Sequence, residues 1–251
     1  MTQVLRATLE INLKMLKLPA ILKNYDRVTT SALTERMSCE QYLHHLTEIE
    51  IQHRRKKRVE VLLKMSKIPI NKTLDSYDFD QVKNLKKQTI IELSSGNFLS
   101  DAKNIVLHGP PGTGKTHLAM AICRELCIKG HKVLYTTACE LLQELIRAKN
   151  NLSLSRLFKR MRSYQLVCID ELGFVPYKKE EAELLFQFIS DRYEKASLMI
   201  TTNLVFSEWD RVFKDEATTA AVIDRIIHHC FILEVFSESY RSKEAKKNWQ
   251  K

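Results

Sequence analysis

The stretch HGPPGTGKTHLA, residues 108–119, combines residue types and spacing that predict the binding of phosphate groups. Gly109 is followed by four residues and then by Gly114, Lys115 and Thr116, which is the spacing of a phosphate-binding P-loop. Glycine permits positive φ angles and the close approach of an anion to backbone N–H groups. We therefore expect a nucleotide to be contacted by Gly109, Pro110, Pro111, Gly112, Thr113, Gly114, Lys115, Thr116 and His117.

The lysine and the threonine of this stretch have separate expected roles with ATP and Mg²⁺. Lys115 would reach the β- and γ-phosphates, and the Thr116 hydroxyl would be a Mg²⁺ ligand. A glycine-rich turn without a ligand is the alternative. The flanking sequence favours the P-loop, because a strand-like apolar run precedes it and a helical pattern follows it over residues 115–130.

A second candidate lies in LVCIDELG, residues 166–173, where an apolar run ends in two adjacent carboxylates. Asp170 is expected to hold the Mg²⁺ shell, and Glu171 is expected to polarise the attacking water. A strand that ends in Asp-Glu before a glycine is, by itself, more typical of a solvated turn. Downstream of a P-loop the catalytic interpretation is favoured, because hydrolysis needs both a metal anchor and a base.

Three further side chains are candidates for contact with the transferred phosphate. Asn203 ends the apolar run LMITTN, and we expect it either to bind the γ-phosphate or the water, or to cap the strand. Arg225 follows an apolar helical face and would act either as an arginine finger toward an adjacent subunit or as a partner of Asp224. Arg241 would either approach the γ-phosphate of its own subunit or lie on the surface.

The elements that must position these residues begin at residue 103, where short apolar runs start to alternate with helical patterns. Strands rich in Val, Ile and Leu on both faces, separated by helices, predict an α/β fold with a parallel sheet covered by helices on both faces. Ligands bind such sheets at the carboxyl ends of the strands. The expected strands cover residues 104–109, 132–137, 165–170, 197–203 and 231–236.

The chain is expected to form two domains that divide near residue 70. Residues 1–70 contain no glycine, have a helical pattern, and carry 13 Lys plus Arg against 7 Asp plus Glu. We expect a small all-helical domain over residues 1–70 that makes assembly, DNA or partner contacts, followed by an ATPase domain over residues 71–251. The net charge of +10 predicts an anionic partner beyond the nucleotide, with nucleic acid as the leading class.

Composition also argues against membrane and secreted classes. The chain has no run of about 18 apolar residues, and its N-terminus lacks the apolar stretch of a signal peptide, so we expect a soluble cytoplasmic protein. The six cysteines form no C-x-x-C pair and are expected to be reduced thiols. The adjacent His228, His229 and Cys230 suggest a metal group, but neighbouring side chains cannot all converge on one ion, so we expect buried or helix-surface positions.

The motifs GPPGTGKTHLA, IDELGFVP, ELLFQFISDRYE, ITTNLVFSEWDRVF, DRIIHHC and ESYRSKEA together resemble the IstB-like family of insertion-sequence helper ATPases. This family is similar to bacterial helicase loaders of the DnaC type within the AAA+ ATPases. The resemblance covers nearly all of residues 70–245 and, more loosely, the helical N-terminus. It implies an AAA+ fold, a nucleotide-driven homo-oligomer with nucleotide at subunit interfaces, a sensor role for Asn203, a finger role for Arg225 and a second-sensor role for Arg241.

The resemblance further implies a protein that uses ATP to assemble on target DNA and to recruit or stimulate a cognate transposase. Two alternatives stay open at this point. A replicative helicase loader of the DnaC type would be distinguished by the neighbouring reading frame. A nucleotide-switched DNA-binding module without significant hydrolysis would be distinguished by a turnover assay with and without DNA.

Two basic segments are candidates for the DNA contact. Residues 147–162 contain six cations and no acid, between the second and third expected strands, where related AAA+ proteins carry helices that face a central channel. The run HRRKKR at residues 53–58 would encircle a helix, so only part of it could face a phosphate backbone. Neither segment has interleaved aromatic residues, so we expect backbone contacts with little sequence preference. The candidate cations are Arg147, Lys149, Arg156, Lys159, Arg160 and Arg162 in the first segment, and Arg54, Arg55, Lys56, Lys57 and Arg58 in the second.

Overall fold

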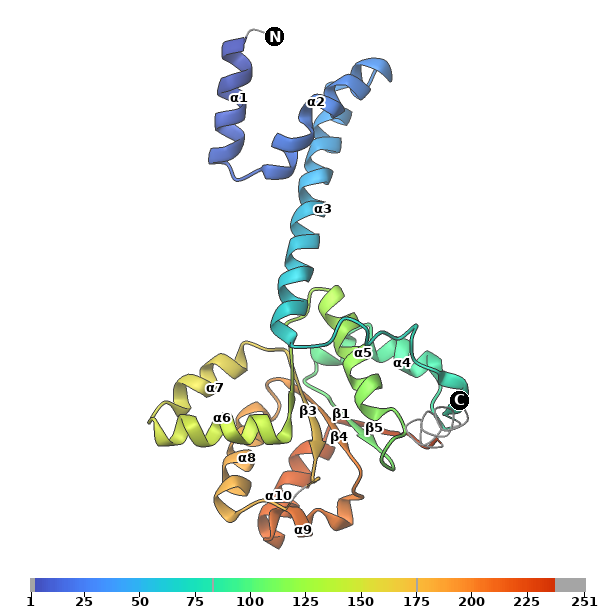
Figure 1. The fold of residues 1–251 in the computed structure, drawn as a ribbon, viewed down its shortest axis with the longest axis vertical. Coiled ribbons are helices and arrows are strands. Elements are labelled where there is room, and N and C mark those ends of the chain that lie inside the picture. Colours follow the sequence, from blue (N-terminus) through green and yellow to red (C-terminus); the bar gives the residue numbers. More distant parts are fainter. Residues whose placement is uncertain (1–2, 83, 175, 238–251) are drawn as a thin grey trace, which may run out of the picture. The chain divides into compact units, whose positions relative to one another are not determined.

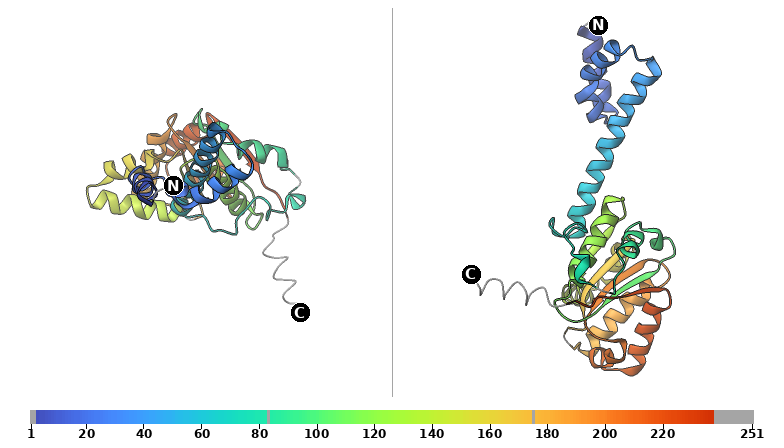
Figure 2. Two further views of the ribbon diagram at one scale, coloured as in Figure 1. Left: turned by 90° about the horizontal axis from the view of Figure 1, so that it is seen from above. Right: turned by 90° about the vertical axis from the view of Figure 1, so that its right-hand side faces the viewer.

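The computed structural model describes residues 3–82, 84–174 and 176–237, so that Arg241 lies outside the described residues. The chain forms two compact units, Met1–Val61 and Leu62–Lys251 (Figures 1 and 2). Their boundary lies inside helix α3 (Cys39–Ser66), whereas the boundary expected at residue 70 follows the end of that helix. None of the helices in the described ranges is long and apolar enough to cross a membrane.

The N-terminal unit consists of α1 (Gln3–Met15), α2 (Pro19–Thr34) and the first part of α3. A capping box begins α3. The Ser38 N–H donates to the Gln41 side chain at 2.8 Å, and the Gln41 N–H donates to the Ser38 hydroxyl at 3.2 Å. The buried apolar residues that join the three helices are Leu13, Ile21, Tyr25, Val28 and Leu46.

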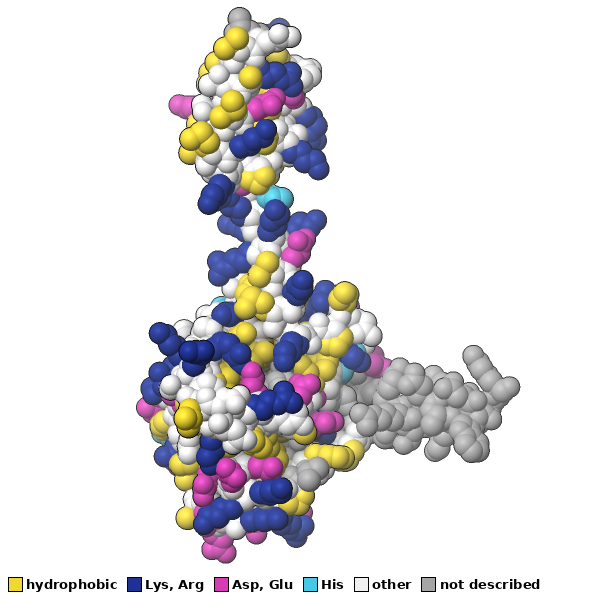
Figure 3. Space-filling model, turned by 60° about the vertical axis from the view of Figure 1, so that its left-hand side comes forward, with side chains coloured by type: hydrophobic (Ala, Val, Ile, Leu, Met, Phe, Trp, Pro, Cys, Tyr) yellow, Lys and Arg dark blue, Asp and Glu magenta, His cyan; other side chains and the backbone are white. Residues whose placement is uncertain are grey.

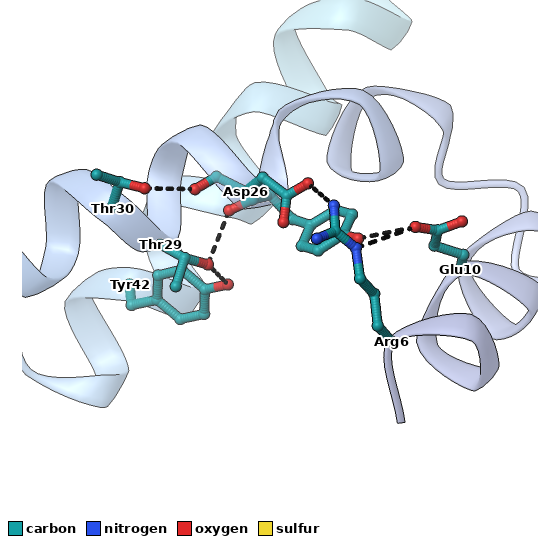
Figure 4. A network of polar contacts seen from close by, with 7 residues as sticks. Arg6, Glu10, Asp26, Thr29, Thr30 and Tyr42 are labelled. Atoms are coloured by element: carbon teal, nitrogen blue, oxygen red, sulfur yellow. Dashed lines mark hydrogen bonds and ion pairs between the residues drawn. The ribbon is translucent and has the colours of Figure 1, made fainter. Parts of the chain in front are cut away.

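Polar contacts also join the helices of this unit (Figure 4). The Arg6 guanidinium of α1 pairs with Asp26 of α2 and lies 3.5 Å from the Glu10 carboxylate. The hydroxyl groups of Thr29 on α2 and Tyr42 on α3 are 2.9 Å apart. Each helix of the unit is therefore linked to a neighbour by side-chain hydrogen bonds as well as by the apolar core.

Glu50 is a buried carboxylate of α3 that caps the start of α2. It accepts hydrogen bonds from the backbone N–H groups of Ala20 at 2.9 Å and Ile21 at 3.3 Å, and from Arg54 Nε at 2.9 Å. Burial by itself raises the pKa of Glu50, but the bonds from Arg54 and from the two amides outweigh it and hold the pKa below its ordinary value. The charged form of Glu50 therefore couples the two helices.

The C-terminal unit is built on a sheet of five parallel strands in the order β2-β3-β4-β1-β5. The strands are β1 (Asn104–His108), β2 (Val133–Thr137), β3 (Leu166–Leu172), β4 (Ser197–Thr202) and β5 (Cys230–Glu234). Successive side chains of a strand point to opposite faces, and on β1 the side chain of Val106 joins one apolar core while Ile105 and Leu107 join the other.

Helices cover both faces of this sheet, as Figures 1 and 2 show, and the predicted α/β fold with a doubly covered parallel sheet is confirmed. The core that contains Ile105 and Leu107 is closed by α4 (Lys87–Leu93) and α5 (Lys115–Ile128). The core that contains Val106 is closed by α6 (Ala138–Asn150), α7 (Leu154–Arg162), α8 (Lys179–Arg192), α9 (Asp210–Phe213) and α10 (Glu216–Ile227). Short 3₁₀ helices lie at Phe79–Gln81, Asn97–Leu99 and Phe206–Glu208.

Candidate functional site

The P-loop connects the carboxyl end of β1 to the first residue of α5. Gly112 and Gly114 have φ angles of 81° and 90°, in the left-handed region that favours glycine. A Cβ atom at Gly109 would lie 2.2 Å from the carbonyl oxygen of Val235, which follows β5. The backbone therefore requires glycine at these positions, and the free N–H groups at the start of α5 form the kind of site that binds a phosphate anion.

Lys115 points into the loop that precedes it. Its ammonium group donates to the carbonyl oxygens of Gly109 at 2.6 Å and Pro110 at 2.7 Å, and only 9% of the residue is exposed. The Thr113 hydroxyl also donates to the Pro110 carbonyl, at 2.9 Å. A phosphate entering the loop would exchange these carbonyl contacts of the ammonium for charge-assisted ones.

His117, on the first turn of α5, contacts the segment that precedes the sheet. Its Nε2 atom lies 3.1 Å from the Ser76 hydroxyl and 3.2 Å from the Thr73 carbonyl oxygen. The ring packs edge-on against Tyr77, and burial lowers the pKa of His117 below its ordinary value. Tyr77 also covers the loop, since a Cβ atom at Gly114 would lie 3.1 Å from its ring. His117 thus fixes residues 73–77 beside the P-loop.

Three hydroxyl groups converge on the carboxylate of Asp170, which is only 2% exposed. Tyr135 donates to Oδ2 at 2.6 Å, Thr116 donates to Oδ1 at 3.1 Å, and Thr201 also donates to Oδ1. Burial and the adjacent carboxylate raise the pKa of Tyr135 well above its ordinary value, so its phenol stays a donor. The two residues predicted as metal ligands, Thr116 and Asp170, are in direct contact.

A register shift near the end of β3 separates the two adjacent carboxylates. Glu171 has a φ angle of 60°, its N–H donates to the Thr201 hydroxyl at 2.9 Å, and its side chain is exposed. Irregularities of this kind re-aim side chains beside active sites. Asp170 consequently faces the buried hydroxyl cluster, while Glu171 faces solvent at the carboxyl edge of the sheet.

Asn203 lies at the same edge of the sheet as the P-loop. It follows Thr202, the last residue of β4, which pairs in register with His108 at the end of β1. Its side chain is exposed. The carboxyl edge therefore presents Asn203 together with Glu171 and the P-loop, which is the arrangement that ligand-binding parallel sheets share.

Arg225 lies at the opposite edge of the sheet. The Asn104 amide, at the start of β1, donates to the carbonyl oxygens of Arg225 at 3.4 Å and Ile226 at 2.9 Å. The guanidinium group donates to the Ala221 carbonyl at 2.8 Å and lies 4.9 Å from the ring centroid of Phe186 on α8. The length of β1, about 13 Å at a rise of about 3.3 Å per residue, separates this edge from the P-loop of the same chain.

Three of the six cations predicted to contact DNA in residues 147–162 form ion pairs with acids on neighbouring helices. Figure 3 shows Lys and Arg side chains interspersed with Asp and Glu on one face of the C-terminal unit. The sequence segment itself holds no acid, so its pattern did not reveal these partners. Lys149 pairs with Glu180 at 2.6 Å, Arg160 pairs with Glu144, and Arg162 Nε pairs with Asp191 at 2.9 Å. The exposed cations of the segment without an ion pair among the described residues are Arg147, Arg156 and Lys159.

In the second basic run, Arg54 forms its contacts within the N-terminal unit. Its guanidinium group binds the Glu50 carboxylate and donates to the Lys17 carbonyl oxygen at 2.7 Å. Residues 55–58 are exposed along α3. Arg54 therefore has a structural role in joining α3 to the start of α2.

Two residues of the site were not predicted from the sequence, namely Tyr135 and Thr201. Both hydroxyls lie near the carboxyl ends of strands, in YTT at the end of β2 and in ITT at the end of β4. Hydroxyl residues close to the ends of two strands of a nucleotide-binding sheet could have been predicted to belong to the site. Their convergence on Asp170, however, depends on both strands lying beside β3.

Comparison with known proteins agrees with the motifs. Residues 11–248 match the family described as IstB-like ATP binding protein. Over 240 residues the chain is 38% identical to an insertion sequence ATP-binding protein of Sinorhizobium fredii, covering 95% of this chain and 80% of the relative. Over 239 residues it is 33% identical to the "Insertion sequence IS21 putative ATP-binding protein" of Pseudomonas aeruginosa, covering 95% of this chain and 90% of the relative.

Solved structures share the fold. The DnaC helicase loader aligns with a TM-score of 0.54 and 23% identity, covering 66% of this chain and 98% of that chain. AMPPCP-bound DnaA from Aquifex aeolicus aligns with a TM-score of 0.58 and 19% identity, covering 73% of this chain and 56% of that chain. These likenesses confirm the predicted AAA+ fold. The match over residues 11–248 and the two sequence relatives establish that the chain belongs to the family of IstB-like ATP-binding proteins.

Proposed function

We propose that this protein is an ATP-hydrolysing helper of transposition that assembles on target DNA as a homo-oligomer and recruits or stimulates a cognate transposase. The family match and the insertion-sequence names of its relatives support the transposition role. The observation that carries the hydrolytic role is the direct contact of Thr116 with the buried Asp170, beside a P-loop that contains Lys115.

The residues of the P-loop and of β3 bind the nucleotide in this proposal. Lys115 leaves the carbonyl oxygens of Gly109 and Pro110 and binds the β- and γ-phosphates. The hydroxyl of Thr116 and the carboxylate of Asp170 are hard oxygen donors, which fit Mg²⁺. When bound there, Mg²⁺ supplies neutralisation of the negative charge that develops on the phosphate oxygens.

The exposed side chains at the carboxyl edge act on the attacking water. Glu171 is the general base, because its carboxylate faces solvent while that of Asp170 is held by three hydroxyl groups. Asn203 orients the water or binds the γ-phosphate. The two adjacent carboxylates thus have separate tasks, which follow from the register shift that aims them in different directions.

Arg225 completes the site of a neighbouring subunit in this proposal. Within its own chain it lies at the amino edge of the sheet, about one strand length from the P-loop, and contacts Phe186 and Ala221. An arginine supplied by a second subunit would stabilise the charge of the transferring phosphate. Hydrolysis would then depend on assembly, with nucleotide at the subunit interfaces.

DNA contacts are assigned first to the exposed cations of residues 147–162 that have no ion pair among the described residues, and second to residues 55–58 of α3. The first set consists of Arg147, Arg156 and Lys159. Cations that already pair with acids release fewer counterions when they meet a phosphate backbone. Binding through these residues would recognise the DNA backbone with little sequence preference.

ATP turnover with and without duplex DNA tests the proposal, using Glu171→Gln and, as a matched control, the exposed Glu183→Gln of α8. We expect Mg²⁺-dependent turnover that DNA stimulates, slow turnover with persistent DNA-bound assemblies in Glu171→Gln, and normal turnover in Glu183→Gln. Rapid turnover in Glu171→Gln would exclude Glu171 as the base. Failure of the ATP-bound assembly to capture the cognate transposase on DNA would reject the helper role.

A further inference from the structure

Two adjacent histidines after α10 lie beside a glutamate after α8, at the amino edge of the sheet. His228 and His229 precede β5, and Glu194 belongs to the turn before β4. The possible ligand atoms of the three side chains all lie within 4.8 Å of one another, and all three residues are exposed. The P-loop and Asp170 lie at the carboxyl edge, so this cluster is separate from the nucleotide site.

Cys230, the third residue of the HHC sequence, is not a member of this cluster. Its thiol lies 3.5 Å from the Phe231 carbonyl oxygen and packs against the apolar core, and burial raises the pKa of Cys230 to about 12. His228, His229 and Cys230 therefore do not all converge on one point, as expected from their adjacency in the sequence. The third member of the cluster is instead Glu194, from the turn after α8.

Neighbouring groups restrain the His228 ring and the backbone at His229 and Glu194. The Tyr193 hydroxyl lies 2.9 Å from His228 Nδ1, and the Glu194 Oε1 atom lies 3.9 Å from the same nitrogen. The contact with Tyr193 orients the imidazole beside Glu194. The His229 carbonyl oxygen accepts the Asn104 N–H at 2.7 Å, which ties that residue to the start of β1. Glu194 has a φ angle of 57°, in a tight turn closed by a 2.9 Å bond from the Lys195 N–H to the Arg192 carbonyl.

We propose that Glu194, His228 and His229 form a site for a transition-metal dication, with Zn²⁺ as the best chemical match. Two imidazole nitrogens and one carboxylate, with water as the fourth ligand, are an established tetrahedral zinc set. Donor atoms around zinc are about 3.3 Å apart, given metal–ligand bonds of about 2.0 Å, so rotation of exposed side chains by modest angles closes the site. Mg²⁺ and Ca²⁺ prefer oxygen donors and do not match two imidazoles.

A metal at this site would join the turn after α8 to the end of α10. His228 is the C-cap of α10, the helix that carries Arg225, and the Arg225 guanidinium already packs on Phe186 of α8. The bound metal would therefore restrain the helix pair that presents Arg225. This consequence can be measured as stability and does not require that Arg225 act in hydrolysis.

Cobalt and zinc titrations of the full chain test the site. Co²⁺ is the probe, because its visible absorption reports coordination by nitrogen and oxygen, and a near-ultraviolet charge-transfer band would report coordination by a thiolate. We expect one equivalent of Co²⁺ to bind, Zn²⁺ to displace it, and Zn²⁺ to raise the thermal midpoint of unfolding. Glu194→Gln and His229→Ala should each weaken Co²⁺ binding at least tenfold and remove the shift, while His45→Ala, an exposed histidine of α3, should change neither.

Several results would overturn the assignment. They are the absence of stoichiometric binding to the wild type, unchanged affinity in either Glu194→Gln or His229→Ala, an equal loss in His45→Ala, and a thiolate charge-transfer band. Circular dichroism of the metal-free variants establishes that they are folded, which is expected because the substituted side chains are exposed. Neither ATP nor DNA is present, so the outcome is independent of the proposed function.

Discussion

Tyr135→Phe removes one hydroxyl group from the Asp170 cluster and keeps the aromatic ring that packs in the core. The hydroxyl donates to the Asp170 carboxylate at 2.6 Å, and the two residues are 8% and 2% exposed. A hydrogen bond to a charged group contributes about 1.5–3 kcal/mol to stability. We therefore expect the free energy of unfolding of the C-terminal unit to fall by about 1.5–3 kcal/mol, which is roughly a 10- to 150-fold change in the folding equilibrium.

Tyr77 provides a matched control in the same unit. It is also 8% exposed, but its buried hydroxyl has no hydrogen-bond partner within the described residues, and burial raises the pKa of Tyr77 to about 12. Tyr77→Phe removes an unpaired polar group, so stability should stay the same or rise by up to about 1 kcal/mol. The difference between the two variants isolates the contact with Asp170 from the general effect of losing a hydroxyl.

Urea unfolding followed by tryptophan fluorescence measures both changes. Trp209 lies in the C-terminal unit and is 1% exposed, and a Trp249→Phe background leaves it as the single reporter. With a slope of about 2 kcal/mol per molar urea, the midpoint should fall by about 1 M in Tyr135→Phe. A loss below about 0.5 kcal/mol, or the same loss in Tyr77→Phe, would refute the inference that the bond to Asp170 stabilises the unit.

Lys115→Ala should lower ATP affinity at least about tenfold in a binding assay, because a charge-assisted phosphate contact is lost, and unchanged affinity would reject the P-loop assignment. Arg225→Ala should reduce turnover on the order of a thousandfold, and mixing it with Lys115→Ala should restore turnover at interfaces that pair an intact loop with an intact arginine. No activity above the sum of the two, in mixed assemblies verified by light scattering, would contradict action in trans. Arg156→Ala combined with Lys159→Ala should weaken DNA binding and flatten its salt dependence, whereas an unchanged slope would move the contact to the basic run of α3. The pKa of Glu50 is lowered in the fold. Its contribution to stability is therefore fully present when the pH is above the ordinary pKa of about 4.3, and it is lost as the pH falls through the folded pKa. Acid unfolding followed by circular dichroism should therefore be less pH-dependent in Glu50→Gln, and an identical pH profile would contradict this role.

The P-loop and the Asp-Glu pair were accessible to sequence reasoning, because each is contained in a few contiguous residues. Gly112 and Gly114 adopt the positive φ angles that their types allow, and α5 begins at Lys115. The parallel sheet was also predictable in type, since strands that are apolar on both faces must be covered on both faces. These features depend on local backbone geometry and on which side chains avoid water.

The partners of the site residues were decided only by the tertiary structure. The strand order places β3 between β2 and β4, so that Tyr135 and Thr201 both reach Asp170. The acids that neutralise Arg160 and Arg162 come from α6 and α8, and Glu194 joins His228 and His229 from the turn after α8. Periodicity records only whether a residue faces the core or solvent. Which distant residue it meets there depends on how strands and helices pack against one another, and no short stretch of sequence contains that information.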